Sequence, residues 1–434
     1  MKDVETIAVV GGGLAGLSVA ALLARQGKQV HLYDAGLLGG RATSQVIKGF
    51  TFNYGAHAIY GRDQSILRTI IKTLKLEITW LDFSSTKAKY EFAGHLTAAP
   101  ANAIGLLKTE VIGGTDKLRF TWEVVKTVLH LERGTPDVSI GQWLAQENVE
   151  ADVSRLMLDL ASSNFFTTEP ENIPSVVYFD YYRKLFRTRK PVSYIAGGWQ
   201  VLITELERVL QENEGTIHRK TKITAIEEIE QRYLLRDRKK DEWTADRVIF
   251  ALPPRDMRKL ALPAPIQSFI EPFAYYEPVE VLVYDVGLSP YIQTPFSYVY
   301  DRTHQLFVTD LSHYDPSIAP KNGQVLQVVA YLAHQYVGNP DYLAKKVKQI
   351  HRLLDQHYPG WRDQLTVERT MKRAIVQEIK WKMGQIALPC FMNEGTGGTI
   401  TFVGDWCEGE GQLSELSFSS AYTVATAWEQ KNAH

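Results

Sequence analysis

Residues 7–34 carry the pattern that most constrains the fold of this chain. An apolar run at 7–10 leads into a Gly-x-Gly-x-x-Gly turn, Gly11 to Gly16, which opens a helix, and a second apolar run ends on Asp34. Strand, turn, helix, second strand and acid in this order are the fingerprint of a βαβ dinucleotide-binding unit. The sequence therefore predicts that the chain binds an adenine dinucleotide.

Each residue of the fingerprint has a mechanical reason. Gly11 allows the tight turn, Gly13 lets the backbone approach a pyrophosphate, and Gly16 lets the helix pack closely on the sheet. The phosphates then meet the free N–H groups at the helix N-terminus, and Asp34 accepts hydrogen bonds from a ribose diol.

Composition excludes several other classes of protein. The 434 residues are 45% hydrophobic and 22% charged, with a net charge of -1, so we expect a globular chain with no nucleic acid partner. Cys390 and Cys407 have no metal or redox spacing, which predicts no metal site and a reducing, cytoplasmic compartment. The strand-turn-helix pattern explains the uncharged run at 7–24, so neither a leader nor a spanning helix is expected.

Nucleotide-like elements recur along the chain, which predicts an α/β fold with two interleaved domains. The first domain takes 1–75, 191–260 and 375–434, and the second takes the helix-rich 76–190 and the strand-rich 261–374. The second domain forms a sheet wall for a substrate cavity in this interpretation.

Several elements of the first domain are predicted from local patterns. Gly197-Gly198 opens an amphipathic helix at 201–211, and strands at 222–226 and 246–253 are expected to return to the first sheet. Near the C-terminus, an apolar strand at 399–406 precedes a helix that starts at about Ser414.

Three further motifs accompany the fingerprint: Gly39-Gly40-Arg41 just after the acid, Gly197-Gly198, and Phe402-Val403-Gly404-Asp405. In this order they resemble the flavin-dependent superfamily of amine oxidases, phytoene desaturases and protoporphyrinogen oxidases. The resemblance implies that the cofactor is FAD. It also implies a Rossmann-type FAD-binding domain interleaved with an α+β substrate domain.

The resemblance assigns cofactor-binding roles to residues from every segment of the first domain. Those for the pyrophosphate, the adenosine and the turns beside them are Gly11, Gly13, Leu14, Ala15, Gly16, Asp34, Ala35, Gly40, Arg41 and Ile223. Those for the isoalloxazine ring and the ribityl chain are Gly55, Ala56, His57, Gly404, Asp405, Leu413 and Ser414. The helix that starts at Ser414 is expected to aim its N-terminal amides at the reduced flavin.

Departures from the family pattern narrow the predicted activity. The segment Val279–Leu282 offers Glu280 where amine oxidases place a lysine near flavin N5, and Leu413 stands where they place an aromatic residue. Asn53 replaces a common acid, and no second glycine fingerprint provides a nicotinamide site. We therefore predict dehydrogenation of a small, apolar organic substrate by hydride transfer to flavin N5, ahead of amine oxidation.

Some interpretations remain open at this level. His57 is a candidate catalytic acid or base, or a packed histidine beside the ring. The basic and aromatic segment 178–190 suits an acidic substrate, a membrane surface, single-stranded nucleic acid or a solvated helix face. The segment 106–131 is either a peripheral membrane contact or ordinary helical packing. A carrier of lipidated partners, resembling the GDP-dissociation inhibitors, is the alternative from another class of protein.

Overall fold

A five-stranded parallel sheet organises the first half of the fold. The computed structural model describes residues 5–392 and 399–431. Residues 1–4, 393–398 and 432–434, which belong to the predicted first domain, lie outside the described ranges. The strand order is β10 (Thr216–Arg219), β2 (Gln29–Asp34), β1 (Thr6–Val10), β14 (Arg247–Phe250) and β20 (Ile400–Phe402). Every neighbouring pair is parallel. Ile7 to Val10 are fully apolar and buried because helices and strands cover both faces of the sheet.

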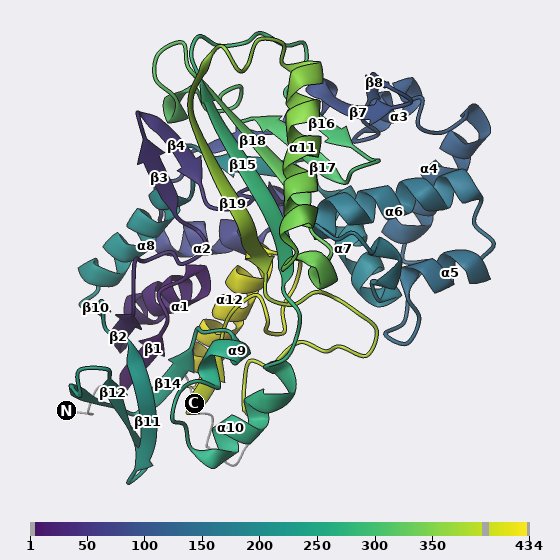
Figure 1. Cartoon of the computed structure of the whole chain (residues 1–434). Coiled ribbons are helices and arrows are strands. Elements are labelled where there is room, and N and C mark those ends of the chain that lie inside the picture. The colour runs from purple at the N-terminus through teal and green to yellow at the C-terminus, as the bar shows by residue number, and fades with distance from the viewer. Residues whose placement is uncertain (1–4, 393–398, 432–434) are drawn as a thin grey trace.

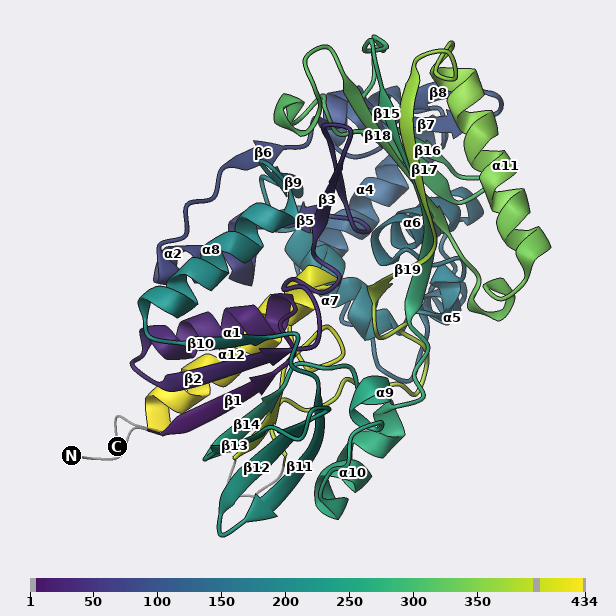
Figure 2. The ribbon, with the colours of Figure 1, turned by 60° about the vertical axis from the view of Figure 1, so that its left-hand side comes forward.

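Three helices lie side by side on one face of this sheet (Figures 1 and 2). They are α1 (Leu14–Arg25), α8 (Trp199–Glu212) and α12 (Ser414–Lys431), and α2 (Ile66–Leu74) packs beside α12. Helix α1 is buried from Ala15 to Ala24 because its small side chains let it lie between two helices and the sheet. The predicted βαβ unit and the predicted helix at 201–211 are confirmed.

One strand assignment in this region was wrong. The strand predicted at 222–226 does not return to the parallel sheet: β11 (Ile223–Ile229) forms an antiparallel meander with β12 (Arg232–Asp237) and β13 (Glu242–Ala245). The strand that does join the sheet edge is β10, which pairs with β2. Both segments are short and half-buried, so hydrophobic pattern alone does not distinguish them.

A seven-stranded sheet forms the second half of the fold (Figure 1). Its order is β19 (Leu365–Gln377), β15 (Val279–Leu288), β18 (Gln324–Tyr331), β17 (Leu306–Asp310), β16 (Tyr298–Asp301), β7 (Ala88–Phe92) and β8 (His95–Ala98). Neighbours are antiparallel except β16 and β7. Helix α11 (Pro340–His357) covers one face through the apolar core under β15 and β18.

A helical layer contacts the other face of the seven-stranded sheet. Its members are α3 (Ala103–Lys108), α4 (Gly114–Val128), α5 (Ile140–Gln146), α6 (Ala151–Phe165) and α7 (Ser175–Arg187). Tyrosines of α7 and of strands β16 and β18 share one apolar cluster between the two layers. The helix-rich character predicted for 76–190 is confirmed by these five helices, and the helix predicted to start at about Ser414 is confirmed as α12.

The remaining elements connect these layers. They are β3 (Ser44–Ile47) with β4 (Phe50–Asn53), β5 (Ile59–Tyr60) with β9 (Val192–Ile195) and β6 (Trp80–Asp82), and the short helices α9 (Pro254–Met257) and α10 (Ala264–Ile270). Strands β7 and β8 join those from 261–374 in one sheet, while β19 crosses the predicted boundary at 374. The domain boundaries themselves stay a prediction. Within the described ranges, no helix is long and apolar enough to cross a membrane.

Candidate functional site

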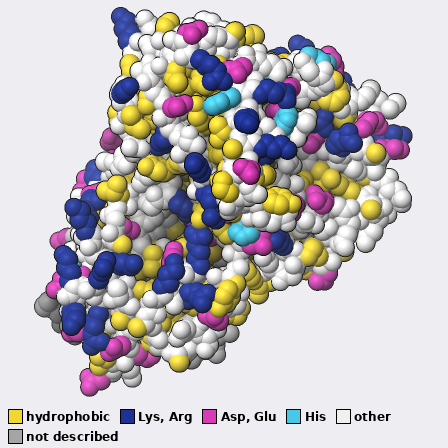
Figure 3. Space-filling model, viewed as in Figure 1, with side chains coloured by type: hydrophobic (Ala, Val, Ile, Leu, Met, Phe, Trp, Pro, Cys, Tyr) yellow, Lys and Arg dark blue, Asp and Glu magenta, His cyan; other side chains and the backbone are white. Residues whose placement is uncertain are grey.

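A cleft lies at the carboxyl ends of the parallel strands, where ligands of open α/β sheets bind. The turns that follow β1, β2, β14 and β20 line it, together with the start of α12 and one end of β19. Most of the predicted cofactor residues lie on this lining: Gly11, Gly13, Leu14, Ala15, Asp34, Gly40, Arg41, Gly55, Ala56, Gly404, Asp405, Leu413 and Ser414. Figure 3 shows lysine and arginine side chains gathered beside a hollow on this face of the molecule.

The glycine turn leaves a cradle at the N-terminus of α1. Gly11 has a φ of 111°, and a Cβ there would lie 2.6 Å from the carbonyl oxygen of Ala251. A Cβ on Gly16 would lie 1.9 Å from the carbonyl oxygen of Gly11, so Gly16 packs the helix against the strand rather than facing the cleft. A Cβ on Gly13 would meet no atom within 4 Å, because Gly13 faces open space at the helix start. The first amides of α1 have no intrahelical partners, so this space suits an anion.

Asp34 stands at the end of β2 on the rim of the cleft. One carboxylate oxygen accepts from Gly12 N–H at 2.6 Å and the other accepts from Gly36 N–H at 2.7 Å. Both contacts fix the carboxylate beside the glycine turn, and its remaining lone pairs are available to ribose hydroxyls. Ala35 follows it but does not line the cleft.

Arg41 and Asp405 meet across the cleft through two parallel hydrogen bonds. Arg41 Nη1 and Nη2 lie 2.9 and 2.7 Å from the two Asp405 carboxylate oxygens. The Asp405 side chain is almost fully buried, whereas that of Arg41 is 40% exposed and keeps further donors toward the cleft. The sequence places these residues 364 positions apart, and the Gly39–Arg41 and Gly404–Asp405 turns bring them together.

Two further residues join this pair that sequence reasoning missed. The buried Glu378 accepts from Arg255 Nη2 at 3.0 Å and lies 3.8 Å from Arg41 Nε. Burial raises the pKa of the Glu378 carboxyl, while the charges of Arg41 and Arg255 oppose that rise. Arg255 was detectable because it follows the end of β14 at the ligand-binding edge. Glu378 follows β19 and carries no motif.

His57 turns away from the cleft although its neighbours Gly55, Ala56 and Ala58 line it. The imidazole packs 5.1 Å from the Tyr194 ring, and its Nδ1 is buried without a partner among the described residues. Burial lowers the pKa of His57 to about 4, against the opposing charge of Asp315. This placement favours the interpretation of His57 as a packed histidine. A catalytic role finds no support, because the imidazole does not line the cleft.

The start of α12 closes one end of the cleft through Leu413. Leu413 has a φ of 58° and its N–H donates to Gln377 Oε1 at 2.6 Å. This bond ties the helix start to the end of β19, and Ser414 follows as the first helical residue on the lining. Ile223, predicted to contact adenine, lies buried at the start of β11 and does not line the cleft.

Several solved structures have the same fold as this chain. One is an oxidoreductase from Methanosarcina mazei, which is 17% identical and has a TM-score of 0.78 over 97% of this chain and 100% of that chain. A candidate protoporphyrinogen oxidase from Exiguobacterium is 18% identical, with a TM-score of 0.74 over 98% and 99%. Cyclohexylamine oxidase from Brevibacterium oxydans is 13% identical, with a TM-score of 0.69 over 99% and 100%. No curated protein matches the sequence.

The fold and the cleft define a nucleotide-binding α/β protein, and the match to a family model identifies it as an FAD-dependent oxidoreductase. The family model of flavin-containing amine oxidoreductases matches residues 14–286, so the chain belongs to that family. This match confirms the family membership predicted from the glycine motifs. It supports an enzyme over the alternative of a carrier of lipidated partners.

The residues of the cleft fit FAD. The open space at Gly13 and the free amides of α1 suit a pyrophosphate, and Arg41 keeps exposed guanidinium donors for it. Asp34 lies at the end of β2, where a ribose is held in this type of fold. The other end of the cleft is apolar at Ala56 and Leu413, which suits a flat ring system.

Proposed function

We propose that FAD extends along this cleft, with its pyrophosphate at the N-terminus of α1 and its ring between Gly55-Ala56 and Leu413. The open Cβ position of Gly13 and the free amides of α1 support the phosphate end. We assign 1–75, 191–260 and 375–434 to the FAD-binding domain and the remainder to the substrate domain. When bound, the flavin supplies the two-electron acceptor of the reaction.

The protein's own residues hold and orient the cofactor in this proposal. Arg41 faces the negative phosphates, and its fixed bond geometry to Asp405 keeps the guanidinium in one orientation. Glu378 pairs with Arg255 and so fixes the position of this second guanidinium at the edge of the cleft. Leu413 and Ala56 exclude water at the ring end.

We further propose that the substrate is an apolar organic molecule that the enzyme dehydrogenates. The supporting observation is the lining: it carries Leu413, the residue predicted to replace the aromatic residue of amine oxidases, and no lysine lies on it among the described residues. Glu280, in the segment where amine oxidases carry a lysine, is buried and paired with Arg373 and His334. An apolar substrate that donates a hydride needs no charged partner in the cleft. An amine substrate would find neither the lysine nor the aromatic residue that the family's amine oxidases provide.

The test is anaerobic bleaching of the FAD-loaded protein. Polyenes and porphyrinogens are expected to bleach the visible flavin absorbance, and the amines putrescine and cyclohexylamine are expected to leave it unchanged. Bleaching by the amines alone would reject the apolar substrate and establish amine oxidation. Putrescine oxidase and cyclohexylamine oxidase share the fold, so their substrates are the natural amine probes.

We also propose that a patch of exposed apolar side chains on α3 and α4 contacts a membrane surface. Leu118, Trp122 and Leu129 fall on one stripe of α4 and its C-cap, with Leu118 74% and Trp122 55% exposed. Ile104 and Leu107 of α3 are also exposed, and Lys117 Nζ donates to the Leu107 carbonyl, which holds the two helices together. We call these five residues the α3–α4 patch. Exposed apolar patches on helices with a polar opposite face are typical of interfacial contact.

Vesicle flotation checks the membrane proposal. The double variant Leu118→Ser with Trp122→Ser should reduce the fraction of protein bound to phosphatidylglycerol vesicles by at least about tenfold, since it removes two large apolar side chains. The control is Ile386→Ser, which removes an equally exposed side chain outside the α3–α4 patch. Equal flotation of the wild type and the double variant would reject this contact.

A further inference from the structure

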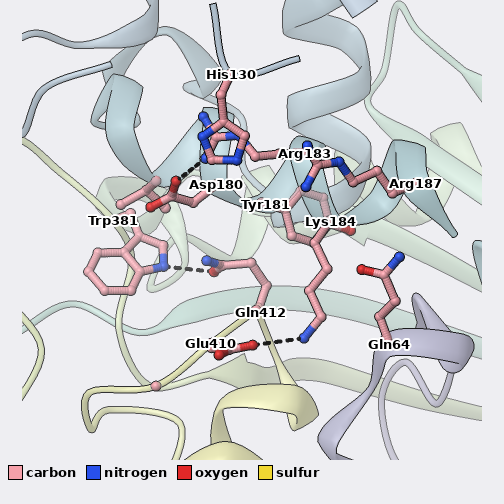
Figure 4. Close-up of a pocket in the computed structure, with 13 residues that line it drawn as sticks. Gln64, His130, Asp180, Tyr181, Arg183, Lys184, Arg187, Trp381, Glu410 and Gln412 are labelled. Carbon is pink, nitrogen blue, oxygen red and sulfur yellow. Dashed lines mark hydrogen bonds and ion pairs between the residues drawn. The ribbon is translucent and has the colours of Figure 1, made fainter. Parts of the chain in front are cut away.

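A second cavity, which we call the α7 cavity, lies beside the nucleotide cleft. It has a volume of about 600 Å³ and is formed by α7, the segment just after α4 and the loop 409–412. Figure 4 shows Arg183, Lys184 and Arg187 of α7 approaching it from one side, with Trp381 and Gln412 across from them. Neither the glycine motifs nor the proposed FAD site accounts for this cavity.

The cations of the α7 cavity are only partly neutralised. Arg183 pairs with Asp180 at 2.6 Å and Lys184 pairs with Glu410 at 3.4 Å. Arg187 donates to the backbone carbonyl of Val128 and has no carboxylate within 4.0 Å among the described residues. Lys184 also pairs with the buried Glu415 at 3.1 Å, so its charge is shared between two carboxylates. Arg187 is therefore the one of these three cations that has no carboxylate partner among the described residues.

Two buried polar atoms on the same helix also lack partners. The Tyr181 hydroxyl and Arg183 Nε are buried and make no hydrogen bond among the described residues, although both side chains line the cavity. Tyr181 is only 6% exposed. Buried polar groups are normally hydrogen-bonded, so these donors indicate a site completed by a ligand.

His130 lies among the same charged groups, and the charge of Asp180 partly opposes those of the arginines there. It lines the α7 cavity just after α4, and partial desolvation together with the charges of Arg183, Arg187 and Arg133 lowers the pKa of its imidazole. The lowering by arginine charges is the effect expected in a positive field. An anion placed among these groups would be stabilised by the same field.

The α7 cavity and the nucleotide cleft share a wall. Gln412 lines the cavity and the next residue, Leu413, lines the cleft. Gln412 Oε1 accepts from Trp381 Nε1 at 2.7 Å, and Gln377 connects the same oxygen to the Leu413 N–H. The lining of the cavity and the lining of the cleft therefore meet at the Gln412–Leu413 peptide.

We propose that the α7 cavity binds the anionic group, a carboxylate or a phosphate, of the organic substrate. Arg187 and the unpaired donors of Tyr181 and Arg183 hold that group, and the apolar part of the substrate lies along Trp381 toward the Gln412–Leu413 wall. This inference rests on the proposed function, and it specifies the substrate as an anionic amphiphile rather than a purely apolar molecule.

The test measures binding of three probes to the FAD-loaded protein. Decanoate, decyl phosphate and decan-1-ol have the same chain and differ in charge, and their affinities are measured by titration calorimetry together with the visible flavin spectrum. The variant is Arg187→Gln, with Arg187→Lys as the charge-retaining partner. Arg189→Gln is the matched control, because Arg189 is a neighbouring exposed arginine that does not line the cavity.

One of the two anions should bind at least about tenfold more tightly than decan-1-ol and should shift the flavin spectrum. Arg187→Gln should weaken that binding by about tenfold, Arg187→Lys should restore most of it, and Arg189→Gln should leave it unchanged. Equal affinity for the alcohol, or anion binding without a spectral shift, would overturn the assignment. Binding only to phosphatidylglycerol vesicles, abolished by Arg187→Gln, would assign the cavity to a lipid headgroup and also overturn it. Calorimetry measures binding without turnover. A negative bleaching assay would therefore reject the proposed dehydrogenation without deciding whether the α7 cavity binds an anion.

Discussion

The glycine turn gives the sharpest prediction, because two of its glycines have opposite surroundings. A Cβ on Gly13 meets no protein atom within 4 Å, whereas a Cβ on Gly16 would lie 1.9 Å from the Gly11 carbonyl oxygen. Gly13→Ala is therefore expected to leave the folded apoprotein intact and to place a methyl group where the pyrophosphate approaches. Gly16→Ala is expected to disturb the packing of α1 on the sheet.

The magnitudes follow from these contacts. Gly13 is the N-cap of α1 with a φ of -73°, which alanine adopts without strain, so the free energy of unfolding should fall by less than about 1 kcal/mol. Displacing the phosphate from one charge-assisted N–H contact costs about 1.5–3 kcal/mol, which lowers FAD affinity roughly 10- to 100-fold. Gly16→Ala should destabilise the apoprotein by about 1–3 kcal/mol through overpacking against backbone.

Gly113→Ala provides a matched control. Gly113 is the N-cap of α4 with a φ of -72°, and a Cβ there also meets nothing within 4 Å, but it lies outside the cleft. FAD affinity is measured by quenching of flavin fluorescence, and stability by chemical denaturation of the apoproteins. FAD binding by Gly13→Ala as tight as that of Gly113→Ala would refute the reasoning.

Two further predictions concern side chains of the first domain. Arg41→Lys loses the paired bonds to Asp405 and is expected to lower FAD affinity about tenfold in the same titration, whereas Arg25→Lys at the far end of α1 should not change it. His57 keeps a folded-state pKa of about 4, below its ordinary 6.5, so its contribution to stability is present above pH 6.5 and is lost as the pH falls toward 4. Wild-type stability should fall by up to about 1.4 kcal/mol per pH unit more steeply than that of His57→Gln in this window, measured by denaturant titration, and parallel curves would contradict the burial of a neutral imidazole. His57→Gln should also keep its rate of flavin bleaching, and loss of that rate with intact FAD binding would restore the catalytic role.

The nucleotide half of the fold was predictable because its signals are local. Strand, turn and helix from β1 to β2 follow within thirty residues, and glycine spacing alone specifies the close approach seen at Gly16. The edge strand β10 was missed because a four-residue, half-buried segment has no periodicity that separates it from β11. The long β19 was missed because its exposed charges resemble a surface segment.

Side-chain placement in the cleft depended on contacts that no local pattern contains. The family resemblance predicts that the segment at Gly55 passes the ring, but it does not predict that His57 packs against Tyr194. The Glu378–Arg255 pair joins residues 123 positions apart, and the α7 cavity combines a helix, a loop and the end of another helix. Such sites arise from tertiary packing, which spacing along the chain does not encode.

A crystal structure of the protein with FAD tests the central claim most directly. The account predicts density for the pyrophosphate against Gly13 at the N-terminus of α1, and for the ring between Ala56 and Leu413. Density for the pyrophosphate at any other helix N-terminus, or a ring placed away from Leu413, would contradict it.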